Sequence, residues 1–105
     1  MSEGKIRAII KRPDEEFGHV TNISPSLKNL QRTVGGHIET VTLAEDFVII
    51  CNEEGRIKGL PYNCEIAGID FLGDIICLGI KGDEFADCPI SFEIWKNLVL
   101  GREEY

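Results

Sequence analysis

Two apolar runs constrain the fold of this chain more than any other feature of its sequence. Phe47–Cys51 is hydrophobic at every position, and Ile75–Ile80 is hydrophobic except at Gly79. A strand with one face in water alternates apolar and polar residues, whereas a strand covered on both faces is apolar throughout. Both runs therefore predict central strands with other elements packed on each face. Gly79 predicts a bulge or the close approach of another backbone segment.

The segment at about residues 25–34 carries the signals of a short helix. Ser24 is expected to cap it by accepting a hydrogen bond from a backbone N–H, and Pro25 fits the first helical position. Gly35 and Gly36 are expected to end it, because glycine readily adopts the left-handed conformation. The apolar stripe of this helix consists of Leu27, Leu30 and Val34.

A second helix is expected at about residues 91–100, with Ser91 as its cap and Gly101 at its end. Its apolar residues form a stripe and an adjoining row: Phe92, Ile94, Trp95, Leu98 and Val99. A helix that is apolar around so much of its circumference contacts more than one surface. Another subunit is one alternative for the second surface.

Shorter patterns predict the remaining strands. Lys5–Arg12 predicts the first strand, and Phe17–Ile23 predicts its antiparallel return. Ile38–Leu43 is rich in β-branched residues and predicts a third strand. Asn52–Gly55 supplies turn residues, and Arg56–Leu60 alternates as a short return strand does. The sequence therefore predicts a hairpin between the first apolar run and Arg56–Leu60.

The rest of the chain reads as connections, with irregular turns at 64–74, a turn at 81–84 and a loop at 85–89. Together the elements predict an α+β fold. It is a mostly antiparallel sheet of about five or six strands with two helices (about 25–34 and 91–100) packed on it. The alternative is a small barrel-like sheet with one helix plugging an end. A chain of 105 residues is expected to form a single domain, residues 1–105.

Charge and hydropathy limit the expected partners and the expected cellular location of the protein. The formal net charge is −7, which disfavours a broad nucleic-acid-binding surface. No apolar run approaches the ~20 residues that a membrane span needs, and the N-terminus lacks the pattern of a secretory signal. We therefore expect a cytoplasmic protein without a membrane contact.

The cysteines do not form a metal or disulfide motif. No two of them have the Cys-x-x-Cys spacing of structural zinc sites, and free cysteine inside an apolar strand behaves as a small hydrophobe. We expect buried free thiols at all four positions: Cys51, Cys64, Cys77 and Cys88.

Familiar catalytic motifs are absent from the sequence. His19 and His37 belong to no metal motif, and neither a nucleophile elbow nor a phosphate-binding glycine loop occurs. A site assembled from distant residues, such as His37 with Asp70 or Asp74, stays open. These absences favour a non-enzymatic protein without catalytic residues, metal or cofactor.

Three stretches carry a family likeness: VGGHIETV, VIICNEEGRIKGLPYN and GDIICLGI. They resemble the family named domain of unknown function 3846, which is carried by bacteriophages, mobile elements and their bacterial hosts. The resemblance runs from about Lys5 to the C-terminal helix. The matching positions are Gly35, Gly36, Asn52, Glu54, Gly55, Leu60, Pro61 and Asn63. The resemblance implies a fold and a bacterial host cell, and it leaves open whether Asn52–Asn63 serves turn geometry or binding.

The first functional hypothesis is a non-enzymatic binding protein for a small anionic, nucleotide-like ligand. By analogy with phage proteins that sequester nucleotide signals of host defence, such a protein removes a signal. One form of this hypothesis is a homo-oligomer with a pocket between its subunits. Basic side chains suit phosphate, and an aromatic ring can stack on a base. The candidate contacts are Lys5, Arg7, Lys28, Arg32, Tyr62 and Asn63.

The second hypothesis is an acidic protein-interaction module that inhibits a host protein. Its basis is the net charge and the acidic segments in predicted loops and the tail. Acids that gather on one face of the fold favour this hypothesis, whereas basic residues that gather in a concavity favour the first.

Overall fold

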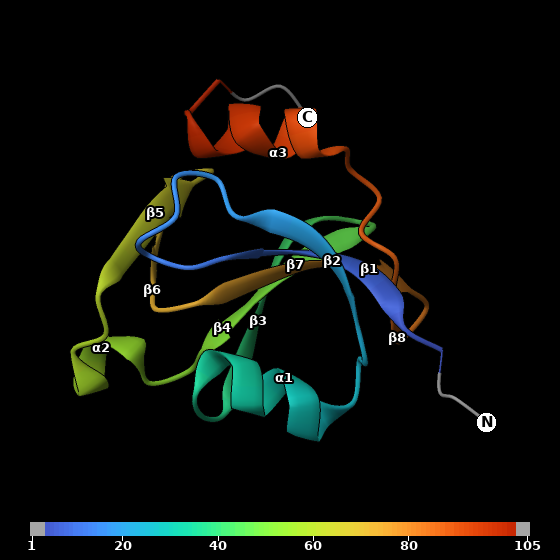
Figure 1. Ribbon diagram of the computed structural model, residues 1–105, viewed down its shortest axis with the longest axis horizontal. Coiled ribbons are helices and arrows are strands. Elements are labelled where there is room, and N and C mark those ends of the chain that lie inside the picture. Colours follow the sequence, from blue (N-terminus) through green and yellow to red (C-terminus); the bar gives the residue numbers. More distant parts are fainter. Residues whose placement is uncertain (1–3, 103–105) are drawn as a thin grey trace.

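The computed structural model describes residues 4–102, which fold into two antiparallel sheets and three helices (Figure 1). The strands are β1 (Ile6–Lys11), β2 (His19–Ile23), β3 (Ile38–Ala44), β4 (Phe47–Asn52), β5 (Tyr62–Ile66), β6 (Ile69–Leu72), β7 (Ile75–Lys81) and β8 (Glu84–Ala86). The helices are α1 (Leu27–Val34), α2 (Gly55–Lys58) and α3 (Phe92–Val99). The α+β expectation is confirmed.

The main sheet has the strand order β2-β1-β7-β4-β3, with β8 beside one end of β7. The two apolar runs form β4 and β7, which pair antiparallel at its centre, as predicted. Every residue of β4 is buried. Helix α1 covers one face of the sheet, whereas α3 and the β5–β6 hairpin cover the other (Figure 1). Both faces are therefore excluded from water, which is why β4 and β7 lack polar alternation.

Helix α1 packs through Leu30 and Val34, two residues of its predicted apolar stripe, whereas the third, Leu27, is 57% exposed. Its cap is Ser26, not Ser24 as expected: the Ser26 hydroxyl accepts from the Asn29 N–H at 3.2 Å. The Ser24 carbonyl instead accepts a hydrogen bond from the Asn29 side-chain amide at 2.9 Å. The helix consequently begins two residues after Pro25. It ends as predicted, with Gly35 left-handed at φ 82°.

Helix α3 begins where the sequence places it, with the Ser91 hydroxyl accepting from the Ile94 N–H at 3.1 Å. Trp95 is fully buried, and its indole N–H donates to the Phe17 carbonyl at 2.7 Å. This bond ties α3 to the β1–β2 connection. The apolar side chains of α3 are accounted for by the core between the sheet and the β5–β6 hairpin.

The predicted return strand Arg56–Leu60 is wrong, because α2 occupies this segment. Strand β4 pairs with β3 on one side and with β7 on the other, so it has no edge left for a third partner. The Asn52 side chain accepts from the Glu54 N–H at 2.7 Å and starts the turn into α2. The alternation of Ile57 with two basic neighbours would indicate a strand only if Ile57 faced the core. Its side chain is instead 86% exposed.

The irregular turns expected at 64–74 are also wrong, because they form the β5–β6 hairpin. Its two-residue connection holds Ala67 at φ 54° and Gly68 at φ 79°, and positive φ at both positions suits the twist of a tight hairpin. Alanine rarely adopts this conformation, so the sequence carries only a weak hairpin signal. Part of the loop expected at 85–89 is β8.

Candidate functional site

One hollow in the described structure has a volume of about 870 Å³, and apolar residues form most of its walls. The C-terminal end of α3 forms one wall, and the tip of the β5–β6 hairpin forms another. Leu43 of β3 and Phe47 of β4 complete it, with Glu65 and Tyr62 as polar members. This hollow exists because α3 and the hairpin are separate elements that do not close over the end of the sheet.

A second hollow of about 440 Å³ lies where α2 and β6 approach β3 and β4. Its walls include the apolar side chains of Val41, Ile57 and Ile69. Four carboxylates also line it: Glu39, Glu53, Glu54 and Asp70. Arg56 is its basic member.

The two hollows lie along the same face of β3, an edge strand of the main sheet. Glu39 and Val41 line the acidic hollow, and Leu43 lines the apolar one. Glu39 and Val41 are alternate residues of the strand, and Val41 and Leu43 pack against the same core cluster, so these three side chains follow one another along one face. We call this surface the β3 groove, defined by the residues that line the two hollows.

Charges in the acidic half of the β3 groove are only partly compensated. Glu54 forms an exposed ion pair with Lys58, with 3.7 Å between Oε1 and Nζ. Asp70 accepts from the Tyr62 hydroxyl at 3.2 Å. Burial raises the pKa of the Cys51 thiol to about 11, and the nearby Glu39 carboxylate contributes to this shift. The groove therefore presents negative charge beside apolar side chains.

The six sequence-predicted ligand contacts do not gather in one place. Lys28 and Arg32 are exposed on α1, which covers the face of the sheet opposite to α3 (Figure 1). Lys5 is exposed just before β1. Tyr62 is exposed and lines the apolar hollow, which places it alone among the six in the β3 groove.

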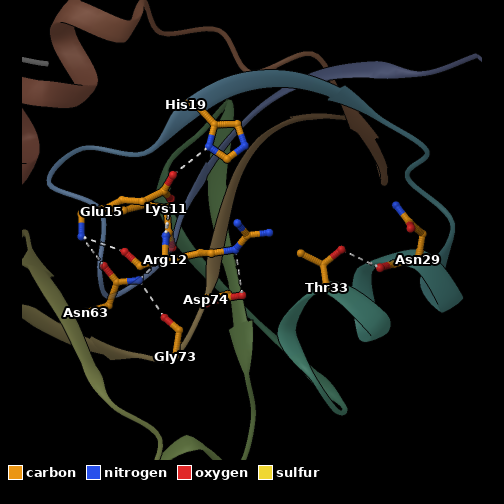
Figure 2. Close-up of polar contacts among 9 residues, drawn as sticks. All are labelled: Lys11, Arg12, Glu15, His19, Asn29, Thr33, Asn63, Gly73 and Asp74. Carbon is orange, nitrogen blue, oxygen red and sulfur yellow. Dashed lines mark hydrogen bonds and ion pairs between the residues drawn. The ribbon is translucent and has the colours of Figure 1, made fainter.

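Arg7 and Asn63 form hydrogen bonds inside the protein. The Arg7 guanidinium donates to the carbonyls of Cys88 and Ile90 at 2.9 and 2.8 Å, so it fixes the segment that leads into α3. The Asn63 side chain joins β5 to β1 and to the β6–β7 turn (Figure 2). It accepts from the Lys11 ammonium at 2.7 Å and donates to the carbonyls of Lys11 and Gly73.

The chain matches the family model "Domain of unknown function (DUF3846)" over residues 6–97. It belongs to the DUF3846 family. No curated protein and no solved structure gives a significant match.

Several positions that match the DUF3846 pattern have structural roles in the fold. The Asn52 amide donates to the Val34 carbonyl at 3.1 Å and so connects β4 to the end of α1. Gly36 leaves room for this contact, because a Cβ atom there would lie 2.9 Å from the Asn52 amide nitrogen. Leu60 packs over Gly73 in the same way. Turn and packing geometry thus account for much of the Asn52–Asn63 segment.

Sequence reasoning missed the β3 groove. In the sequence, Glu39 belongs to a β-branched segment and Asp70 to a predicted turn, and no pattern places these two residues together. The acidic character of Glu53-Glu54 was visible, and it is the one signal that pointed here.

The remaining predictions concern the cysteines, metal ions and membrane spans. All four cysteines are buried and free, as predicted. Among residues 4–102 no group of side chains suits a metal ion, and no helix is long and apolar enough to cross a membrane.

Proposed function

We propose that this DUF3846 protein is an interaction module whose β3 groove binds a basic segment of a partner protein. The single observation that carries the proposal is the position of the acidic hollow, which lies next to the apolar hollow on one face of β3. Acids gathered on one face favour the protein-partner hypothesis over the anionic-ligand hypothesis, because they repel phosphate.

The groove specifies the chemistry of its partner. Negative charge at one end attracts lysine or arginine and speeds association, and the apolar end contributes affinity by removing apolar surface from water. A partner segment with basic residues followed by large apolar residues fits this order. The finer proposal is that the partner is a host protein that normally binds nucleic acid, and that occupation of its basic surface inhibits it.

Capture of partners from bacterial lysate at low salt tests the proposal, because such contacts are screened by salt. The bait is the full chain, compared with a variant that neutralises the groove: Glu39→Gln, Glu53→Gln and Asp70→Asn. A matched control removes the same number of charges elsewhere on the exposed surface, through Asp14→Asn, Glu16→Gln and Asp83→Asn. We expect the chain and the control to capture the same partner and the groove variant to lose it. Equal capture by the groove variant contradicts the proposal.

An anionic, nucleotide-like ligand is the second candidate function. The observation that favours it is the pair Lys28 and Arg32, which are exposed one helical turn apart on α1 and form no ion pair with another described residue. In a homo-oligomer, two such pairs can face one ligand. Calorimetry with cyclic and ADP-ribose-derived nucleotides, repeated on Lys28→Gln/Arg32→Gln, tests it. No heat from any nucleotide counts against it.

A further inference from the structure

Two thiols from distant parts of the chain touch in the core. The sulfur atoms of Cys77 and Cys88 lie 3.7 Å apart, and both side chains are buried. Cys77 belongs to β7, whereas Cys88 lies in the segment between β8 and α3. Gly79 makes this contact possible: a Cβ atom there would collide with the Asp87 carbonyl, so the segment can cross directly over β7. The chain thereby lays Cys88 against Cys77.

Polar contacts hold Cys88 in this position. The Cys88 N–H donates to the Arg7 carbonyl at 2.8 Å, and the Arg7 guanidinium donates to the Cys88 carbonyl. The hydrogen bond from the Cys77 thiol, with the Arg7 charge nearby, lowers the pKa of the Cys88 thiol to about 7. The hydrogen bond and burial raise the pKa of Cys77. A thiolate at Cys88 therefore has a protonated thiol as its neighbour.

The other two cysteines differ in environment. Burial raises the pKa of Cys51 and of Cys64 to about 11. Neither has a sulfur contact within the described residues. Because the thiolate is the reactive form, Cys51 and Cys64 are expected to be slow toward oxidants. They serve as internal controls for the pair.

We propose that Cys77 and Cys88 form a reversible dithiol–disulfide site that is oxidised by small hydroperoxides. Cys88 is only 4% exposed, but it lies between the exposed residues Asp87 and Pro89, so oxidation requires local opening of this segment by enough to admit a molecule as small as hydrogen peroxide. The buried Cys77 then acts as the resolving thiol.

Hydrogen peroxide oxidises the two thiols in two steps. The Cys88 thiolate attacks one peroxide oxygen, the O–O bond breaks, and the hydroxide released takes a proton to leave as water, giving a sulfenic acid. The Cys77 sulfur then attacks the sulfenic sulfur, which forms the S–S bond and breaks the S–O bond. The departing hydroxide takes the Cys77 proton and leaves as a second water. The two thiols lose two electrons, which reduce one peroxide, and dithiothreitol reverses the change.

Mass spectrometry of the peroxide-treated chain tests the proposal. Free thiols are first alkylated under denaturing conditions, and the chain is then digested without reductant by trypsin and a glutamate-specific protease. Cleavage at Lys81 separates Cys77 from Cys88, and cleavage at Glu65 separates Cys64 from Cys77. We expect one dominant cross-linked product, Cys77 with Cys88, while Cys51 and Cys64 carry the alkyl label. Dithiothreitol should remove the cross-link.

Variants and pH identify the reacting atoms. Cys77→Ser should leave a sulfenic acid at Cys88, trapped by dimedone, and Arg7→Gln should slow cross-linking of the native chain several-fold. The rate should rise as pH increases through about 7, where Cys88 becomes a thiolate, and level off above it. Absence of the cross-link in the folded wild-type chain, or a dominant link through Cys51 or Cys64, overturns the proposal.

Discussion

The two faces of the main sheet are covered in different ways. Helix α1 covers one face alone (Figure 1). It packs Leu30 and Val34 on apolar side chains of β1, β4 and β7. On the other face, α3 and the β5–β6 hairpin share the cover. The boundaries between these two elements and the sheet contain the buried polar residues Lys11 and Asn63. Among the described residues the α1 face also contains a buried polar residue, Asn52, which donates to the Val34 carbonyl at the end of the helix. Two covering elements leave more boundaries where backbone groups need polar partners than one helix does.

The same difference explains where the candidate sites lie. Both hollows of the β3 groove and the Cys77–Cys88 contact are on the face that α3 shares with the hairpin. Incomplete cover leaves concavities, and concavities with mixed polarity are where ligands and partners bind. No residue of α1 lines either of these two hollows.

The largest expected effect is that of Asn63→Ala on the shared face. The substitution removes the closest acceptor of the Lys11 ammonium, which is only 2% exposed, and two donors to buried carbonyls. We expect a loss of about 4 kcal/mol in the free energy of unfolding, because each unsatisfied buried group costs about 1–3 kcal/mol. Urea denaturation measures it.

Asn63→Asp is the matched control for this prediction. Aspartate gives Lys11 an acceptor but cannot donate to the carbonyls of Lys11 and Gly73 (Figure 2). Its cost is therefore expected to lie between zero and that of alanine. A loss below about 1 kcal/mol for Asn63→Ala would show that the boundary is not held by hydrogen bonds.

Leu30→Ala tests the α1 face with the next largest effect. Leu30 is fully buried in the apolar cluster beneath α1. The lost contacts and the cavity should lower the free energy of unfolding by about 3 kcal/mol. The exposed Leu27→Ala on the same helix is the control and should change it by under about 0.5 kcal/mol. Similar losses for the two leucines would contradict the assignment of α1 to an apolar face.

Gly36→Ala is expected to lower the free energy of unfolding by about 1 kcal/mol, because overpacking of a tight site typically destabilises a protein by this amount. A Cβ atom at this position would lie 2.9 Å from the Asn52 amide and 3.0 Å from the Lys58 ammonium. Lys58 can move away, but Asn52 is held by its bonds to Val34 and Glu54. Thermal unfolding measures the change, and Gly36→Ala combined with Asn52→Ala should show less than the summed cost. Additive costs would mean that the two positions do not touch.

The smallest expected effect on stability belongs to Ile57→Ser in the β3 groove. Ile57 is 86% exposed, so its loss should change the free energy of unfolding by under about 0.5 kcal/mol. The same substitution should weaken capture of the partner, because it removes an apolar contact from the groove. Unchanged capture would exclude Ile57 from the interface.

Local patterns predicted the parts of the fold that depend on neighbours in sequence. The continuous apolar runs predicted β4 and β7, and Gly35 predicted the end of α1. Residues 56–60 failed because their alternation is local, whereas a strand needs a partner edge, and both edges of β4 were already taken. Four of the six candidate ligand contacts rest on positive charge (Lys5, Arg7, Lys28 and Arg32), and charge does not say which face of a sheet a residue occupies.

The sequence by itself determined the class of fold, the family, the central strands, the boundaries of α1 and α3 to within two residues and the burial of the cysteines. These features follow from periodicity and from the conformational limits of glycine and proline. Only the tertiary structure decided that Glu39 meets Asp70 in one groove and that Cys77 touches Cys88. Contacts of this kind depend on how segments that are distant in the sequence pack against one another. The Asp87–Cys88 segment, for example, crosses β7 at Gly79, and no local sequence pattern predicts that crossing.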